Sequence, residues 1–148
     1  MKRQLFAAAT LMASLSLAQT AHAAECAVAV DDPFALEAAA IEEIYACIKD
    51  ELVAGYAKEG DAVASAYRDW TVSSTRPAVA GAHGNRLLYT FANDIAAEQY
   101  LKYATEGVNM PVGSVLAKES ITISAKKKAA VPGPLFIMTK GEPGSAPE

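Results

Sequence analysis

The sequence predicts an α+β domain in which two main helices pack against a small antiparallel β-sheet, behind a cleaved signal peptide. Apolar residues recur at helical spacing between residues 32 and 60, and they alternate at every second position between residues 114 and 124. The predicted elements follow one another in the order helix, strand, helix, strand, strand. This order is typical of an α+β domain, because a parallel sheet would alternate strands and helices regularly.

Length and composition are those of one globular domain. The chain has 148 residues, of which 52% are hydrophobic and 20% are charged, a balance that favours a folded core over disorder. The formal net charge is −4. An acidic protein is repelled by nucleic acid and by anionic membranes, so we expect neither as a partner.

Residues 1–23 have the three parts of an export signal. Lys2 and Arg3 form a basic start, residues 5–17 form a short apolar stretch, and Ala21-His22-Ala23 matches the small-residue pattern before a cleavage site. The apolar stretch is too short to cross a bilayer, and its flanks disfavour a buried core helix. We therefore expect a soluble periplasmic protein after cleavage.

Cys26 and Cys47 are predicted to form a disulfide, since exported cysteines pair in an oxidising compartment. The bridge would contribute about 3 kcal/mol by restricting the unfolded chain. Three other roles fit less well. Glu25 precedes Cys26 where a lipid anchor needs a small residue, no metal ligands lie nearby, and a redox pair favours Cys-x-x-Cys.

The first helix is predicted to start at Asp32, as N-cap, with Pro33 in its first turn, and to end at Gly60. Its apolar stripe consists of Leu36, Ala40, Ile44, Cys47, Ile48 and Leu52. Residues 61–82 then form a connection. Within it, Tyr67 and Trp70 are interpreted as covering the core, with a binding role as the alternative.

A strand is predicted at residues 86–91, and a second helix from Asn93 or Asp94 through Glu106, with Gly107 as its stop.

The clearest strand is predicted at residues 114–124. One face carries Val115, Ala117, Ile121 and Ile123, interrupted by Glu119, and the other carries Ser114, Lys118, Ser120 and Thr122, with Leu116 as the exception. Residues 126–128 read as a solvated turn. A last strand follows at residues 135–140, and residues 141–148 read as a disordered tail.

Common catalytic and metal-binding motifs are missing from the sequence. His83 is the only histidine that remains after export, and no Gly-x-Ser-x-Gly elbow or Gly-rich phosphate loop accompanies it. One histidine and scattered carboxylates do not make a zinc site, so no metal site is predicted from these residues.

Three sequence segments carry a resemblance to a known family. They are His83-Gly84-Asn85-Arg86, Met110-Pro111-Val112-Gly113-Ser114-Val115-Leu116-Ala117-Lys118-Glu119 and Gly133-Pro134-Leu135-Phe136-Ile137-Met138-Thr139-Lys140. In their order and spacing, the segments resemble the cytochrome P460 / cytochrome c′-β family of exported haem proteins. The resemblance covers roughly residues 56–140, and it implies a P460-like domain at residues 24–140.

The resemblance also implies a function and partners. Family members carry haem c and act as oxidoreductases on hydroxylamine or bind nitric oxide. Small nitrogen species, a redox partner and a homodimer are therefore the expected partners, with the chemistry supplied mainly by the cofactor.

Two residues are candidates for cofactor binding by the same resemblance. Lys118 occupies the place of a lysine that the P460 branch joins to the haem edge, which requires an amine desolvated enough to lose its proton. The alternative is an ordinary solvent-facing lysine. Met110 would line the haem pocket, or else fill the core.

The family attaches haem c through a C-terminal Cys-x-x-Cys-His segment, which this chain lacks. We therefore expect a domain truncated before that segment. His83 could in principle ligate iron, although its glycine-flanked position favours a turn. Three functions remain open: a P460-type haem protein, a haem-free binding or interaction domain, and a non-functional fragment.

Overall fold

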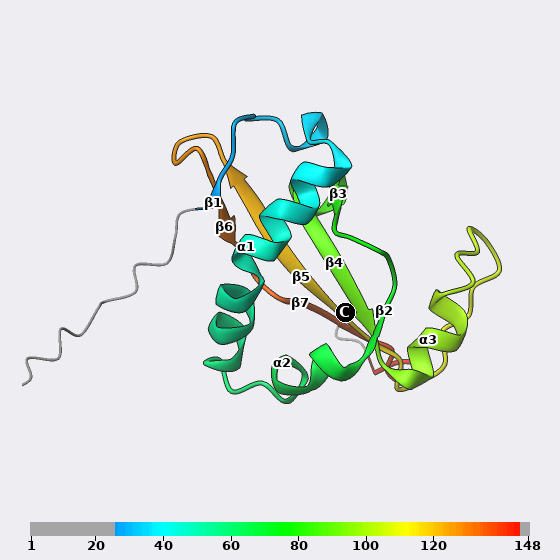
Figure 1. Cartoon of the computed structure of the whole chain (residues 1–148). Helices are drawn as coiled ribbons and strands as arrows, with labels where there is room; N and C mark the ends of the chain where they lie inside the picture. Colours follow the sequence, from blue (N-terminus) through cyan, green and yellow to red (C-terminus); the bar gives the residue numbers. More distant parts are fainter. Residues whose placement is uncertain (1–25, 146–148) are drawn as a thin grey trace, which may run out of the picture.

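The computed structural model of the protein describes residues 26–145. In this range, three α-helices pack with one antiparallel sheet, which confirms the predicted α+β class (Figure 1). The predicted signal peptide and the last three residues of the predicted tail lie outside the described residues. Across residues 26–145, the helices lack the combination of length and apolar character that a membrane crossing requires.

The sheet contains seven strands, and each paired strand runs antiparallel to its neighbour. In chain order the strands are β1 (Cys26–Ala27), β2 (Thr71–Val72), β3 (Ala78–Ala80), β4 (Arg86–Ala92), β5 (Val115–Ser124), β6 (Ala129–Pro132) and β7 (Phe136–Thr139). The spatial order is β1-β6-β5-β4-β2, with β3 also paired to β4 and β7 to β5. The predicted strands correspond to β4, β5 and β7. No strand was predicted at β1, β2, β3 or β6, which have only two to four residues each.

Strand β5 lies at the centre of the sheet. One of its edges pairs with β4, whereas the other pairs with β7 over Val115–Lys118 and with β6 over Ile121–Ser124. The chain passes from β6 to β7 at Gly133, whose N–H donates to the Ser120 carbonyl at 2.8 Å. Two short strands thus share one edge of β5.

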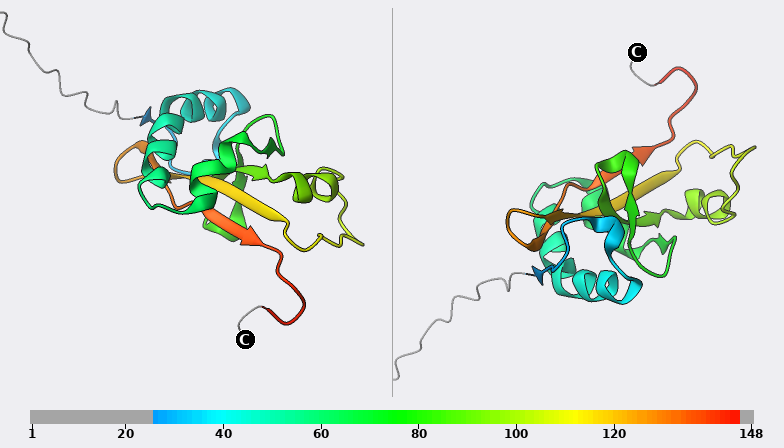
Figure 2. Two further views of the ribbon diagram at one scale, coloured as in Figure 1. Left: turned by 90° about the horizontal axis from the view of Figure 1, so that it is seen from below. Right: turned by 90° about the horizontal axis from the view of Figure 1, so that it is seen from above.

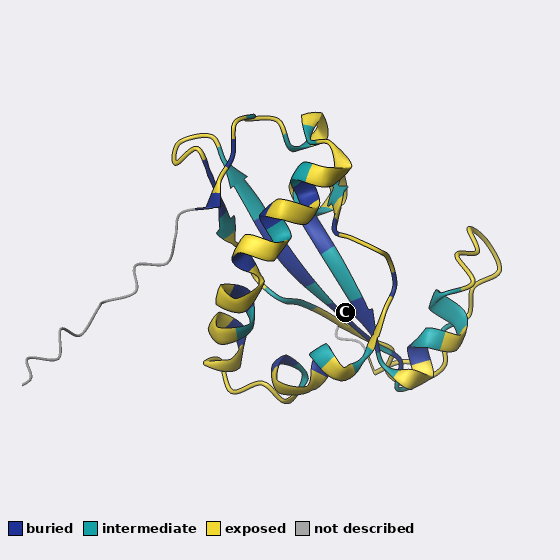
Figure 3. Cartoon of the chain, in the orientation of Figure 1, coloured by how far each residue is buried: buried dark blue, intermediate teal, exposed yellow. Residues whose placement is uncertain are grey.

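Helix α1 (Ala38–Ala57) lies across one face of the sheet (Figures 1 and 2). Its buried residues are Ile41, Ile44, Ile48, Leu52 and Tyr56. Three- and four-residue spacing places them in one stripe that faces the sheet, while the side of the helix that faces away from the sheet stays exposed (Figure 3).

The predicted start of this first helix is wrong. The Asp32 carboxylate accepts a hydrogen bond from the Phe34 N–H at 3.0 Å, but it caps the 3₁₀ turn η1 (Pro33–Ala35). The backbone is then extended at Leu36 and Glu37, so α1 begins only at Ala38. An N-cap residue followed by proline is compatible with a single 3₁₀ turn as well as with the start of a long helix, so this pattern does not distinguish the two.

A short helix and two 3₁₀ turns form the connection between α1 and β4. Helix α2 (Ala62–Ala66) is capped by Asp61, whose carboxylate accepts from the N–H groups of Val63 and Ala64. The turns are η2 (Tyr67–Asp69) and η3 (Gly81–His83). Tyr67 is fully buried in the core, as its predicted core role requires, and the partly buried Trp70 packs against the same core.

Helix α3 (Asp94–Tyr100) begins as predicted and ends early. The Asn93 side-chain oxygen accepts from the Ala96 N–H at 3.0 Å, which confirms the cap. The predicted end at Glu106 is wrong, because Tyr103 adopts a left-handed backbone with a φ of 51°. The hydroxyl of Tyr103 donates to the Ser73 carbonyl, and this contact directs the chain away from a helical path.

The two faces of the sheet bury different clusters. Leu87, Phe91, Ala117 and Ile121 join the main core beneath α1. On the opposite face, a smaller cluster of Ala92, Ala96 and Leu116 packs under α3. The predicted faces of β5 are therefore confirmed, and Lys118 lies on the α3 side.

The predicted disulfide is present. It joins Cys26 in β1 to Cys47 in α1, and the two Cα atoms lie 5.9 Å apart. The bridge holds the first described strand against the middle of the helix.

Candidate functional site

Lys118 lies in the middle of β5, where strands on both sides fix its backbone. Its partners across the sheet are Thr90 of β4 and Phe136 of β7. The side chain is half-buried, and within residues 26–145 it makes no hydrogen bond or ion pair. Desolvation by burial lowers the pKa of this amine from its ordinary value. A lysine without a counter-ion in a rigid strand is available to a ligand.

The Lys118 side chain lines a cavity of about 530 Å³. This volume is within the range of about 300–1,000 Å³ that small-molecule and cofactor sites occupy. Residues from β3, β4, β5, the end of α3 and the neighbouring loops line it: Ser73, Ser74, Ala78, Val79, Ala80, His83, Leu88, Thr90, Gln99, Tyr100, Tyr103, Ala104, Val108 and Lys118. The lining contains no carboxylate, so the charge of Lys118 is not neutralised within it.

His83 lines the same cavity from the turn η3. Its imidazole packs edge-to-face on the Phe136 ring, with the ring centroids 4.9 Å apart and an angle of 71° between the planes. The buried Nδ1 atom has no hydrogen-bond partner among the described residues. The turn role expected for His83 is correct, and the turn places its ring beside the cavity.

Tyr103 holds one wall of the cavity in place. Its hydroxyl donates to the Ser73 carbonyl, so the segment after α3 is joined to the segment after β2. Both segments line the cavity. Tyr103 is 66% exposed, which leaves this rim accessible to a ligand.

Met110, the second candidate, lies elsewhere on the same face of the sheet. It packs against the small cluster that contains Ala92, Ala96 and Leu116. It also lines a separate cavity of about 180 Å³, together with Ser114 and Met138. The structure therefore does not bring Met110 and Lys118 into one site.

On the α1 face of the sheet, Glu119 forms a buried polar cluster. Its carboxylate, 1% exposed, accepts hydrogen bonds from the hydroxyls of Tyr45 at 2.8 Å and Tyr67 at 2.6 Å. Arg68 Nε lies 3.3 Å from Glu119 Oε1. Burial, with the hydrogen bonds to Glu119 and its charge, raises the pKa of both tyrosines. Because both carboxylate oxygens are buried and bound by side chains of this chain, we interpret the cluster as structural.

Sequence reasoning missed most of the Lys118 cavity. The tyrosines at positions 100 and 103 and the segments of residues 73–80 and 99–108 line it, but no local motif marks them. One signal was present for the other cluster, since Glu119 interrupts an apolar strand face and a buried carboxylate requires partners.

Within residues 26–145, no three histidine, cysteine or acidic side chains gather as a metal site would require. Comparison of the chain with protein-family models, curated proteins and solved structures found no match. A functional assignment therefore depends on the residues and geometry of this chain.

Proposed function

We propose that this protein is an exported, P460-like haem protein whose haem lies in the Lys118 cavity, against strands β4 and β5. The observation that carries the proposal is the placement of an amine and an imidazole on the walls of one cavity of cofactor size, without a carboxylate in its lining. The sequence resemblance to the P460 family had pointed to Lys118 independently of this cavity.

The residues present fit such a group. The imidazole of His83, which lines the cavity, is a nitrogen donor of the kind that haem iron accepts. Lys118 offers an ammonium group to a haem propionate, or an amine at the haem edge as the resemblance implies. Leu88, Val79 and Val108 supply apolar surface for a porphyrin.

Cys26 and Cys47 would not supply thioether bonds to haem. These two cysteines are joined to each other, so neither thiol is available to a haem vinyl group. When bound, haem iron supplies redox and nitric-oxide-binding chemistry. Hydroxylamine oxidation or nitric oxide binding, with a redox partner, is therefore the activity we propose.

Titration of the purified chain with hemin tests the proposal. We expect saturable binding of one haem per chain, followed through the Soret band. His83→Gln should change the ligation-sensitive bands of the spectrum. Lys118→Met should weaken binding about tenfold, as expected for loss of one half-buried charge pair.

Lys126→Met is the matched control, because Lys126 is exposed and lies outside the cavity lining. Circular dichroism checks that each variant is folded. A folded wild-type chain without saturable hemin binding would reject the proposal. Equal spectra and affinities for wild type, His83→Gln and Lys118→Met would reject the assigned site.

A haem-free interaction domain is the second candidate. Strand β7 pairs only with β5 among the described strands, which leaves its outer edge open. Ile137 and Met138 on this strand are 39% and 52% exposed. Open edges with apolar side chains are where other chains add, including a second copy of the same chain. Sedimentation equilibrium of wild type and Met138→Lys tests self-association, and a monomer in both cases would remove the homodimer.

A further inference from the structure

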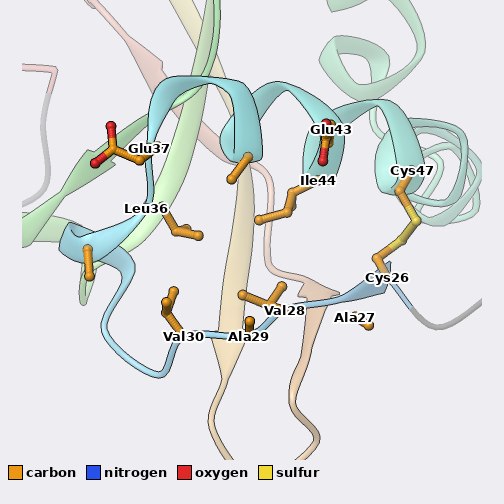
Figure 4. A pocket seen from close by; sticks show the side chains of 12 residues that line it. Cys26, Ala27, Val28, Ala29, Val30, Leu36, Glu37, Glu43, Ile44 and Cys47 are labelled. Atoms are coloured by element: carbon orange, nitrogen blue, oxygen red, sulfur yellow. A yellow bond between two sulfur atoms is a disulfide. The ribbon is translucent and has the colours of Figure 1, made fainter.

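A second cavity, of about 470 Å³, lies between the first described segment and helix α1 (Figure 4). Its lining residues belong to residues 26–30, 35–37, 40, 43–44 and 47, and none of them lines the Lys118 cavity. The haem proposal makes no use of this cavity.

The cavity lies between two points at which the segment is attached to the rest of the fold. At one end the Cys26–Cys47 disulfide and the pairing of β1 with β6 fix the chain. At the other end Asp32 caps the 3₁₀ turn η1, and the backbone then runs extended into α1. Between these two attachments the segment and the helix enclose open space.

The walls of this space are aliphatic. Val28, Val30 and Leu36 of the segment and Ile44 of α1 point into it (Figure 4). Several alanines complete the lining, and the disulfide lies at one end. Such walls offer no hydrogen bonds to water. Replacing this water by an alkyl group is therefore favourable, because apolar surface is buried.

The charged groups in the lining are two carboxylates. Glu37 and Glu43 lie at the rim, both are exposed, and neither forms an ion pair among the described residues (Figure 4). The Glu37 side chain also makes no capping hydrogen bond, although this residue is the N-cap of α1. No lysine, arginine or histidine lines the cavity. The rim therefore attracts a cation and repels an anion.

We infer that this cavity binds an amphiphilic cation. The aliphatic part of the ligand lies among Val28, Val30, Leu36 and Ile44, and its ammonium group lies at the acidic rim, in the field of Glu37 and Glu43. Alkyl amines and quaternary alkylammonium compounds are the ligand class. The ligand does not compete with haem for space, because the two cavities share no residue.

The probes are octylammonium, octanoate and octanol, which share one alkyl chain and differ in the charge of the head group. Each is titrated into isotopically labelled wild-type protein, and amide chemical shifts are followed by NMR. We expect saturable shifts confined to residues 26–47, with octylammonium binding at least about tenfold more tightly than octanoate, because the two exposed carboxylates attract the ammonium group and repel the carboxylate of octanoate.

Two variants separate the head group from the tail. Glu37→Gln with Glu43→Gln should reduce the affinity for octylammonium to that for octanol, while Glu42→Gln with Glu51→Gln, on exposed positions of α1 outside the lining, should leave it unchanged. Ala40→Phe should fill the cavity and prevent binding of all three probes.

The inference is rejected if octanoate binds as tightly as octylammonium, if the shifts spread over the whole surface, or if the Glu37/Glu43 double variant binds octylammonium as wild type does. These three results decide the question even if Ala40→Phe does not fold.

Discussion

Glu119 is the acidic side chain that the described core buries, and three neighbours compensate its charge. Two tyrosine hydroxyls donate to the carboxylate, and Arg68 lies beside it with a side chain that is 32% exposed. Arg68 also donates to the Tyr45 hydroxyl at 2.6 Å. A buried carboxylate without such partners would destabilise the fold. The core can therefore contain Glu119 only together with Tyr45, Tyr67 and Arg68.

Replacing Glu119 by Gln should lower the free energy of unfolding by roughly 2–3 kcal/mol. The amide cannot accept both tyrosine hydroxyls as a carboxylate does, and Arg68 loses its counter-ion; the partial exposure of Arg68 keeps the loss below that of a fully buried pair. Urea unfolding measures the change. Glu51→Gln, on the exposed side of α1, is the control and should change stability little. An equal effect of both substitutions would contradict the structural role of Glu119.

Stability should fall above a pH of about 10, the ordinary pKa of tyrosine. Burial raises the pKa of Tyr56 to about 12, and it raises the pKa of Tyr45 and Tyr67 as well. The unfolded chain then loses protons that the folded chain keeps, so stability present below pH 10 is lost as the pH rises toward 12. Urea unfolding at several alkaline pH values measures the slope.

Tyr56→Phe tests this alkaline dependence at one residue. The Tyr56 hydroxyl donates to the Gly133 carbonyl at 2.9 Å and accepts from the Ser120 N–H at 3.3 Å, so its loss should cost about 1–2 kcal/mol at neutral pH. The same variant should show a shallower fall of stability above pH 10. An unchanged slope would show that Tyr56 ionises alike in the folded and unfolded chains.

The sequence identified Glu119 as an anomaly but could not identify its partners. Tyr45 and Tyr67 lie 74 and 52 positions before it in the chain. Alternation along β5 places a carboxylate on the apolar face, whereas the choice of partners depends on how α1 and η2 cross the sheet. Local sequence patterns predict the face of the strand on which a residue lies, but they do not predict its partners from distant elements.

At the scale of elements, the passage from β6 to β7 depends on a glycine. A Cβ atom at Gly133 would lie 2.4 Å from Ser120 Oγ and 3.1 Å from the Ser120 carbonyl oxygen. The Ser120 hydroxyl is itself held by the Pro134 carbonyl at 2.6 Å. The crossing segment can therefore approach β5 only where the side chain is absent.

Gly133→Ala should destabilise the protein by about 1–3 kcal/mol, since overlap with a well-packed strand displaces side chain or backbone. Adding Ser120→Ala removes the overlap with the hydroxyl and should recover part of the lost stability. The recovery stays incomplete, because the close contact with the Ser120 carbonyl oxygen remains. Gly55→Ala is a control of opposite sign: it lies in α1 with nothing within 4 Å of the new Cβ, so it should stabilise by about 0.5–1 kcal/mol. Thermal unfolding compares the variants, and a neutral Gly133→Ala would contradict the close approach.

Helix boundaries show how far capping signals predict an element. Asn93 is correct as the start of α3, because its side chain satisfies the Ala96 N–H and also accepts from the Val115 N–H of β5. Asp32 caps a single turn instead of α1. The predicted end of the second helix at Glu106 is wrong, because Tyr103 contacts Ser73, which is 30 positions earlier in the chain. A cap is local information, but helix length is decided by what the following residues contact.

For the whole molecule, strand alternation predicted which face of the sheet carries Lys118, and the structure places a cavity on that face. The remaining walls could not be predicted. They come from residues 73–80 and 99–108, two segments far apart in the chain that the hydrogen bond from Tyr103 to Ser73 joins. His83 reaches the cavity through a turn and a contact with Phe136, so its position required the packed strand β7.

The disulfide allows a test of whether the two faces of the molecule act separately. Cys26 and Cys47 close a loop with a sequence separation of 21 on the α1 side, away from the Lys118 cavity. Replacing both cysteines by Ala should lower the free energy of unfolding by about 3 kcal/mol, through a less restricted unfolded chain. Reduction of the wild-type protein is the control and should give a similar loss in urea unfolding. Because neither cysteine lines the Lys118 cavity, hemin titration of the folded variant should match wild type. Weaker hemin binding with an intact circular dichroism spectrum would instead show that the N-terminal attachment and the Lys118 cavity are coupled through the sheet.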